Sequence, residues 1–515
     1  MKFPTRRAAL ATAVSLASIA LVVGCTAAPE QPAGDGGTDT VRGESLTLGT
    51  VLEVNSFDPA QAHFAHHRQF FQPTYDSLLR QEPDGTIVPM LATEWEYNDD
   101  STELTLTIRD DVEFTDGTEL DADAVKFNLE RLKDGNGPAA STLALVSSIG
   151  APSDDTVVIE LDAPDPGLLY NMSVQASFIG SPTAIEAGSI DTQPVGSGPY
   201  VMDVAASVPG SEYTFTINED YWDPSLQHYD EIVLSVIPDA TARLNALLAG
   251  QIDGALLTPK SQKQAVDGGL VDHLAEVNIA GIMLLDRAGS VLEPLGDSRV
   301  RQAINYAINR EELVAQVEVG LGTPTSQIFP ESSPAFKPEY EDFYSYDPDK
   351  ARELLEEAGY ADGFDFEIPA VLVDPAFQAA VSQYLGDVGI RVTWNERPAS
   401  EGIAVASSGD YVASVKPNAQ GPTWIMANQL FTPDAVYNPF HSTDPRIESA
   451  METIQFGSEE ESVAAQQELN TVLTEDAWFA PFYRPSLVYV TNAETDVETQ
   501  VGQAVPSLYY YTPVG

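Results

Sequence analysis

The segment "VEFTDGTELDADAVKFNLERL", residues 112–132, decides most about the fold of this 515-residue chain. Asp121 is placed to cap a helix, because a short acidic side chain accepts hydrogen bonds from the first free backbone N–H groups. Val125, Leu129 and Leu132 then recur at helical spacing and share one face. The segment therefore predicts a helix that begins at Asp121 and packs this apolar face on a core.

Further helices and strands are marked on both sides of this segment. In "YDPDKARELLEEAGY", residues 346–360, Asp347 can cap a helix, Pro348 suits its first turn and Gly359 ends it. A second apolar stripe at helical spacing lies in "GDSRVRQAINYAINREELV", residues 296–314. Period-two alternation predicts strands in 45–53, 102–114, 156–162 and 212–219. The fold class predicted is mixed α/β (α+β), with polar connections on the outside.

Composition and charge exclude several classes of protein. The chain is 43% hydrophobic, so it can bury large cores and is not disordered by composition. Its formal net charge is −53, which argues against nucleic-acid binding and against attraction of the folded body to anionic lipid. We interpret the acidity as a device for solubility, in a medium whose salt screens self-repulsion.

The N-terminus has the features of an export signal. Lys2, Arg6 and Arg7 precede an uncharged apolar run that ends at Cys25, the single cysteine of the chain. A basic start and a short apolar core predict a signal peptide over 1–24. The sequence before Cys25 resembles a bacterial lipobox, which implies a lipidated Cys25 at the mature N-terminus and a flexible tether over 25–45. An uncleaved anchor, or a plain signal with an incidental cysteine, is the alternative.

Catalytic motifs are missing from the sequence. It contains no GxSxG elbow, no GxxxxGK[ST] loop, no HExxH and no DxDxDG calcium loop. We therefore predict that the protein is not an enzyme, and we predict no cofactor.

Two other features point to ligand contact. His63, His66 and His67 would share one face of a helix, at a spacing able to hold a metal or an anionic ligand. The alternative is three partly exposed histidines on an ordinary helix. Trp424 follows Gly-Pro between polar flanks and is a candidate for the wall of a pocket.

Five segments in order resemble one family, the extracytoplasmic solute-binding proteins of the peptide/nickel class (family 5) that serve ABC importers. They are "YDSLLRQEPDGTIVPMLATEWE", "VEFTDGTELDADAVKFNLERL", "PVGSGPY", "DSRVRQAINYAINREELV" and "YDPDKARELLEEAGY". The resemblance implies a two-lobe periplasmic-binding-protein fold of type II, with an extra subdomain inserted in the first lobe. It also implies capture of a solute in the cleft between the lobes and delivery to an ABC permease in the cell membrane.

The resemblance also implies a division of the chain. Lobe I would comprise 46–70, 190–285 and 485–515, the inserted subdomain 71–189, and lobe II 286–484. The protein would be a monomer that meets the membrane only through the lipid on Cys25. Its ligand would be a peptide or another oligomeric polar solute, such as an oligosaccharide.

The residues expected in the cleft come from both predicted lobes. Phe57, Trp424 and Tyr437 would stack on the ligand, Asn55, Ser56 and Asn428 would hydrogen-bond to it, and His63 and His67 would face it. Arg287, next to Asp286, would either meet a ligand carboxylate or form a salt bridge at the hinge. Family members that bind peptides often carry an aspartate soon after a tryptophan, where Ala427 and Asn428 stand here.

Three other functions stay open at this point. The first is a nickel or metal-chelate binder of the same fold that uses His63, His66 and His67. The second is a sensor module without an importer. The third, from a different class, is an extracellular hydrolase acting through two carboxylates.

Overall fold

A computed structural model describes residues 42–515, apart from 63–64, 175, 372, 399–400 and 416–417. The predicted signal peptide, Cys25 and all but the last residues of the predicted tether lie outside the described residues. Within the part of the chain that is described, no helix has both the length and the apolar character needed to cross a membrane.

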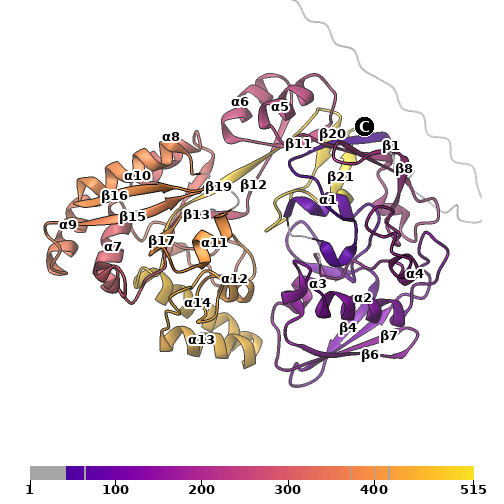
Figure 1. Ribbon diagram of the computed structural model, residues 1–515, viewed down its shortest axis with the longest axis horizontal. Helices are drawn as coiled ribbons and strands as arrows, with labels where there is room; N and C mark the ends of the chain where they lie inside the picture. The colour runs from indigo at the N-terminus through magenta and orange to yellow at the C-terminus, as the bar shows by residue number, and fades with distance from the viewer. Residues whose placement is uncertain (1–41, 63–64, 175, 372, 399–400, 416–417) are drawn as a thin grey trace, which may run out of the picture. The chain divides into compact units, whose positions relative to one another are not determined.

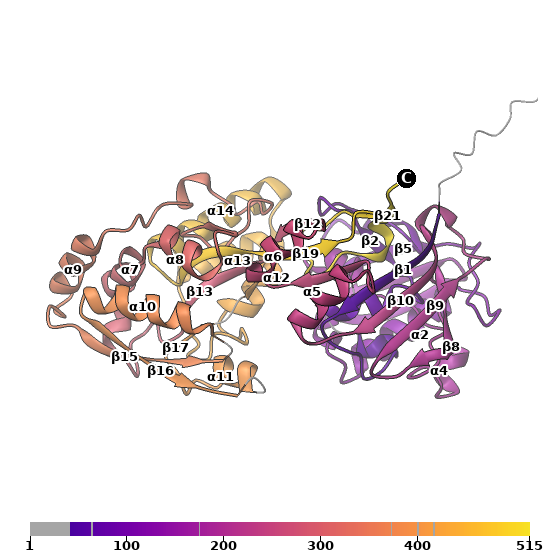
Figure 2. The same ribbon diagram turned by 90° about the horizontal axis from the view of Figure 1, so that it is seen from above.

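The largest sheet of the described residues has eleven strands. At one end, β1 (Gly43–Thr50) pairs in parallel with β10 (Tyr229–Val236), and β9 (Glu212–Ile217) and β8 (Tyr200–Val208) continue the sheet antiparallel. Figure 2 shows these four strands side by side. The alternating segments 45–53 and 212–219 thus form neighbouring parts of one sheet, as their period-two pattern requires.

The strand β19 (Ala480–Thr491) joins the two ends of this sheet. Its first residues pair with β13 (Asn278–Leu284) and β14 (Gly322–Pro324), and its last residues pair with β11 (Gly254–Leu257) and β12 (Val271–Glu276). The short strands β17 (Ala413–Ser414) and β18 (Asn418–Ala419) pair with opposite ends of β13. The strand β19 therefore runs without a break from one part of the sheet to the other.

A separate four-stranded antiparallel sheet has the order β4-β5-β7-β6. Its strands are Ala92–Tyr97 (β4), Glu103–Ile108 (β5), Val146–Ser153 (β6) and Thr156–Leu161 (β7). The helix α2 (Ala122–Asp134) packs on β6 and β7 (Figure 1). Asp121 caps α2 by accepting from the Ala124 N–H at 2.8 Å. Val125, Leu129 and Leu132 are buried, so the prediction for this helix is confirmed.

The buried hydrophobic side chains fall into two groups of clusters, which we use to define two lobes. Three clusters use residues between Leu46 and Ala265 and between Val488 and Tyr511, and we call this part lobe I. Two clusters use residues between Ala280 and Tyr483, and we call this part lobe II.

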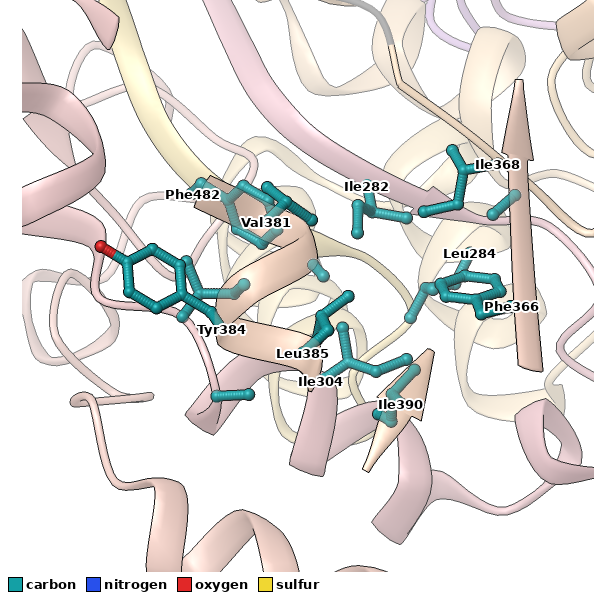
Figure 3. Close-up of a cluster of buried hydrophobic side chains, with 14 of the residues drawn as sticks. Ile282, Leu284, Ile304, Phe366, Ile368, Val381, Tyr384, Leu385, Ile390 and Phe482 are labelled. Atoms are coloured by element: carbon teal, nitrogen blue, oxygen red, sulfur yellow. The ribbon is translucent and has the colours of Figure 1, made fainter. Parts of the chain in front are cut away.

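The core of lobe II lies around a parallel pair of strands, β15 (Phe364–Ala370) and β16 (Ile390–Glu396). Side chains from these strands, from α10 (Pro375–Asp387) and from β19 point toward one another in Figure 3, and Ile304 of α7 (Ser298–Tyr306) joins them. The helix α9 (Pro348–Glu357) has its cap at Asp347, as predicted, and packs on α7.

The segment 296–314 differs from the single stripe that the sequence suggested. It forms two helices, α7 and α8 (Arg310–Val317), with Asn309 between them as the cap of α8. The Asn309 side chain accepts from the Glu312 N–H at 3.1 Å. The turn also places Arg310 in the interior, where Nη1 donates to the carbonyls of Asn305 and Tyr344. The cap at Asn309 and the buried Arg310 thus divide the segment into two helices, which the spacing of its apolar residues alone did not predict.

The remaining elements connect these parts. The helices are α1 (Arg68–Phe71), α3 (Leu168–Met172), α4 (Pro182–Glu186), α5 (Ala240–Leu248), α6 (Pro259–Asp267), α11 (Gly402–Ser407), α12 (Thr423–Leu430), α13 (Pro445–Phe456) and α14 (Glu459–Glu475). Two small antiparallel pairs complete the strands, β2 (Leu79–Gln81) with β3 (Ile87–Pro89) and β20 (Thr495–Val497) with β21 (Tyr511–Pro513).

Candidate functional site

Two segments of lobe I contact lobe II, and these contacts locate the candidate site. At the first, Gln455 Nε2 of α13 donates to the Pro164 carbonyl at 3.0 Å, and a Cβ added to Gly167 would lie 2.6 Å from Ile425 Cδ1. At the second, a Cβ added to Gly502 would lie 3.4 Å from the Gln420 carbonyl oxygen. We call the surroundings of these two contacts the contact zone. A side chain at 167 would have to displace the Ile425 side chain of α12, so the two lobes approach closely at this glycine.

The start of α12 supplies an aromatic wall to the contact zone. Trp424 is half-buried on the first turn of α12, and its Cδ1 would lie 3.1 Å from a Cβ at Gly167. Asp165, opposite, accepts from the Gly167 N–H at 2.9 Å. Burial raises the pKa of Asp165, and hydrogen bonds from the Gly167 backbone and the Trp424 side chain oppose that rise.

A cavity of about 290 Å³ opens beside Trp424, and Asn428, one helical turn on, lines it as well. Asn428 Nδ2 donates to the Trp424 carbonyl at 3.0 Å, which fixes the amide against the helix. The other lining residues are Thr432, Pro433, Ile447, Glu448, Met451, Glu452, Gln455 and Phe456. Two of the residues predicted to bind the ligand thus share one cavity with an apolar floor and a carboxylate rim.

A second cavity, of about 420 Å³, adjoins the contact with Gly502. Val501 lines it from lobe I, and Pro330, Ser332 and Phe336 are among the residues that line it from lobe II. Arg484 forms part of its wall, with Nη2 2.5 Å from a Glu341 oxygen and Nε 3.0 Å from a Glu276 oxygen. Because both carboxylates hold this guanidinium, Arg484 has a scaffolding role in the wall.

Buried amide groups surround the contact with Gly502. Gln500 Nε2 donates to the Gln81 carbonyl, and Gln503 Nε2 donates to Gln81 Oε1 at 3.1 Å. Gln420 Nε2 of lobe II donates to the Ile328 carbonyl at 2.9 Å, while its Oε1 is buried without a hydrogen-bond partner. An acceptor buried in this state is costly unless a ligand or a water supplies the donor.

Arg68 is the cation nearest to these amides. Its Nη1 donates to Gln500 Oε1 at 2.7 Å, its Nε is buried without a partner, and the side chain is 7% exposed in a setting of tyrosines that includes Tyr170. Burial lowers the pKa of Arg68 to about 10. The contact zone thus offers an unused acceptor on Gln420 and an unused donor on Arg68.

Sequence reasoning missed Arg68, Gln81, Gln420, Gln500 and Gln503. Single glutamines carry no motif, and only the fold brings residues 68, 81, 420 and 500–503 to one place. Gln420 lies four residues before Trp424, so the polar run before the tryptophan was the only available signal.

The loop after β1 has another role than the one predicted. Phe57 is 4% exposed, and its ring packs against Phe70, Phe71, Tyr213 and Phe215 at centroid distances of 5.3–6.4 Å. The structure therefore gives the Phe57 ring a packing role in this aromatic core, and the stacking on a ligand that the sequence suggested stays a prediction.

The neighbours of Phe57 were predicted to hydrogen-bond to a ligand. Ser56 Oγ donates to the Asp191 carboxylate and accepts from the Asp58 N–H at 3.0 Å, so its hydrogen bonds are internal. Asn55 is exposed. Tyr437 is half-buried against the second core of lobe II and does not line the cavity beside Trp424.

The histidine cluster is described only in part, because His63 lies outside the described residues. His66 and His67 are half-buried in a single 3₁₀ turn, Ala65–His67, rather than on a long helix. Burial lowers the pKa of His66, and the neighbouring charges of His67 and Arg243 lower it further. Among the described residues, no group of three or more His, Cys, Asp or Glu side chains is placed to hold a metal ion.

Contact of Arg287 with a ligand carboxylate stays a prediction. The other role expected, a salt bridge at the hinge, is not seen, because the Arg287 side chain forms no salt bridge within the described residues. Its Nε donates to the Trp478 carbonyl at 2.9 Å.

Solved structures with the same fold place the chain in a class. The structure of AgaA from A. tumefaciens R10 in complex with agropinic acid is similar with a TM-score of 0.76 and 23% identity, covering 92% of this chain and 99% of that one. DppA from Helicobacter pylori in complex with the peptide STSA gives a TM-score of 0.76 and 20% identity, covering 92% and 98%. The fold class is therefore that of two-lobe, mixed α/β periplasmic binding proteins of type II, as the sequence predicted.

The family follows from the sequence match. The profile of the bacterial extracellular solute-binding proteins, family 5 (middle region), matches residues 86–443, so the chain belongs to this family. Heme-binding protein A of Haemophilus influenzae is 30% identical over 333 residues, which are 58% of this chain and 59% of that protein. Glutathione-binding protein GsiB of Shigella flexneri is 30% identical over 334 residues, 62% of each. The chain thus spans about three fifths of the length of these relatives.

Proposed function

We propose that this protein captures a peptide or another oligomeric polar solute between its lobes and delivers it to an ABC import permease. The observation that carries the proposal is the contact zone itself. In a chain of the solute-binding family, buried amides and a half-buried indole lie where the two lobes touch, and each of the two contacts adjoins a cavity. Sites for small ligands combine apolar walls with a few polar groups in this way.

The polar groups indicate what the solute must offer. Gln420 Oε1 needs a donor and Arg68 Nε needs an acceptor, so a solute with both amide N–H and C=O or carboxylate groups satisfies them together. A peptide has this pattern. The likeness to a protein named for glutathione, which is itself a short peptide, supports the same class. Closure of the lobes would bury these bonds away from water, where each is worth more than at the surface.

Asp165 is the carboxylate of lobe I that lies against the indole in the contact zone, where it could pair with a peptide amine, while Glu448 and Glu452 line the neighbouring cavity from lobe II. The raised pKa of Asp165 follows mainly from burial, which a nearby ammonium group would offset. We propose that an amine of the solute lies near Asp165, in place of the acid that peptide binders often carry soon after a tryptophan.

We propose that the chain is divided much as the sequence suggested, with lobe I on both sides of lobe II and residues 71–189 inserted in lobe I. The change of core between Ala265 and Ala280 and between Tyr483 and Val488 supports crossings in those two intervals. The separate sheet β4-β5-β7-β6 supports an inserted subdomain.

We also propose that residues 1–24 are a signal peptide, that Cys25 carries a lipid which holds the protein at the cell membrane, and that the protein acts as a monomer without catalysis. The sequence pattern before Cys25 supports the anchor. Replacement of Cys25 by serine would release the protein from membranes into the soluble fraction. Retention in the membrane fraction would reject the anchor.

Native mass spectrometry of the purified protein, without added ligand, tests the proposed binding. We expect an adduct of a few hundred daltons that is lost on denaturation and whose fragments are peptides or sugars. If only the bare protein is seen, titration calorimetry with di- to pentapeptides follows, with an expected Kd in the micromolar range, about −8 kcal/mol. Failure of peptides and oligosaccharides in both experiments would reject the proposed solute class. Turnover of a solute by the pure protein would reject a purely binding role.

A further inference from the structure

Arg287 is a buried cation whose charge is not balanced by a carboxylate. The side chain is 7% exposed and lies over the rings of Trp478 and Phe479, at 4.6 and 4.8 Å from their centroids. Nε donates to the Trp478 carbonyl, Nη1 donates to Asn438 Oδ1 at 3.2 Å, and Nη2 has no hydrogen-bond partner. A guanidinium removed from water without an opposite charge is strongly destabilising.

The acids nearest in sequence are already in use. Asp286 accepts four hydrogen bonds from the loop that follows it, from the N–H and hydroxyl of Ser290 and the N–H groups of Val291 and Leu292. Asp444 is paired with Arg446. Burial lowers the pKa of Arg287 to about 9, with a smaller contribution from the charge of Arg301.

A second unused group lies beside this arginine. Asn438 is fully buried, and its Oδ1 accepts both from Arg287 Nη1 and from the Ser442 N–H, at 3.2 and 3.1 Å. Ser442 is 7% exposed, and its Oγ is buried without a hydrogen-bond partner. Asn438 thus links Arg287 to Ser442. Each of these two residues keeps an unused donor, which is Nη2 in Arg287 and the hydroxyl group in Ser442.

We propose that Arg287 Nη2 and Ser442 Oγ bind a monovalent anion of the size of chloride inside lobe II. Arg287 and Ser442 do not line the cavities of about 290, 420 and 570 Å³, so we assign the smallest class of anion, a single atom, to these two donors. A halide accepts from several donors at once and supplies the missing negative charge.

The anion site is far from Gln420 along the strand β13. Asn278, at the start of β13, pairs with Ala419 next to Gln420, whereas Leu284, at its end, pairs with Ala413. Six residues of strand at about 3.3 Å each separate the two ends by about 20 Å. Arg287 follows the far end, and Asn438 connects it to the Thr432 carbonyl, in the lining of the cavity beside Trp424.

Thermal unfolding of the full chain tests the site. Melting is followed in sodium chloride, in sodium bromide and in sodium methanesulfonate at equal ionic strength, so that general screening is the same in all three. We expect the Tm to rise by about 2–4 °C in chloride and bromide relative to methanesulfonate. Arg287→Met and Ser442→Ala should remove most of this difference. Ser442→Ala deletes one small group, so it keeps the test open if Arg287→Met does not fold.

The matched control is Arg310→Met, at another buried arginine of lobe II, whose N–H groups donate to carbonyl oxygens of the chain. This variant should lower the Tm in every salt, but the Tm in chloride should still exceed the Tm in methanesulfonate by the same amount as in the unaltered protein. Equal Tm values in chloride and methanesulfonate for the unaltered protein, or a difference that survives in Ser442→Ala, would overturn the proposal. Anomalous diffraction from crystals in bromide gives the direct result: a bromide peak beside Nη2 supports the site, and a water there in saturating bromide rejects it.

Discussion

Arg310 in lobe II and Arg68 in lobe I are both buried arginines without a carboxylate partner among the described residues, yet their surroundings differ. Arg310 Nε donates to the Thr325 and Pro481 carbonyls, and its two other nitrogens donate to the side chain and backbone oxygens of Asn305 and to the Tyr344 carbonyl. Within the described residues, the Arg68 side chain makes one hydrogen bond, to Gln500, and keeps a buried Nε without a partner.

The difference separates a scaffolding arginine from one available to a ligand. Burial is nearly the same, 6% exposed for Arg310 and 7% for Arg68, and burial lowers the pKa of each to about 10. What differs is the number of N–H groups that find acceptors within the chain. Because an unmade hydrogen bond in the interior is costly, the incomplete set at Arg68 indicates a bond that is completed by something else.

Replacement of Arg310 by methionine should have the largest effect. It leaves several carbonyl oxygens buried without donors, so we expect a loss of about 3–5 kcal/mol in the free energy of unfolding. Solute affinity should change less than twofold, since Arg310 lines neither cavity of the contact zone. Urea denaturation and calorimetry measure the two quantities. Arg391→Met, at an exposed arginine paired with Asp365, is the control and should stay within about 0.5 kcal/mol of the unaltered protein.

Asp76 extends the comparison to a buried acid. It is fully buried in lobe I and accepts from the Trp222 indole and from the hydroxyls of Tyr221, Ser197 and Tyr509, with no cation in a salt bridge to it among the described residues. Burial raises the pKa of Asp76 from 3.8 to about 6, although the four donors oppose the rise. The folded state then holds the proton more tightly than the unfolded state.

The tighter proton binding by Asp76 in the folded state stabilises the fold fully below pH 3.8. This stabilisation is lost as the pH rises through about 6. We expect the difference in unfolding free energy between the unaltered protein and Asp76→Asn to fall by up to about 3 kcal/mol from pH 4 to pH 7. Denaturation curves at four pH values within that range measure it. A difference that grows with pH would mean that the four donors outweigh burial and that the pKa is lowered.

Arg68→Met should affect stability less than Arg310→Met does, and solute affinity more. Only one hydrogen bond within the chain is lost, so the expected destabilisation is about 1–2 kcal/mol. Solute affinity should fall about tenfold or more, because a ligand acceptor buried against Arg68 loses its donor. Gln500→Ala removes the same internal bond and leaves the guanidinium in place, so it separates packing from ligand contact. An affinity unchanged in Arg68→Met would place the ligand elsewhere.

The sequence predicted the fold better than the site. Helix α2 was predictable because capping at Asp121 and the stripe Val125, Leu129 and Leu132 are local signals. The break between α7 and α8 was not, because hydrophobic periodicity continues through Ile308 while Arg310 is held by distant carbonyls.

The site residues show the same limit. Phe57 and Trp424 are both aromatic residues near predicted loops, and nothing local told the buried ring from the ring beside a cavity. Arg68, Gln81, Gln500 and Gln503 had no local signal, because their role depends on segments more than 400 residues apart in the sequence, such as Gln81 and Gln500.

Trp424→Ala should have the smallest effect on stability and a clear effect on binding. The indole is half-buried at the surface of the second core of lobe II, so we expect a loss of about 1 kcal/mol or less in unfolding free energy. It forms a wall of the cavity beside Asn428, and loss of a stacking surface should weaken solute binding about five- to tenfold. Trp394→Ala, at a tryptophan of lobe II packed on Phe377, is the matched control and should lower stability while leaving affinity unchanged. If the two variants lose affinity equally, the loss reflects general loosening of lobe II, and the start of α12 is not part of the binding site.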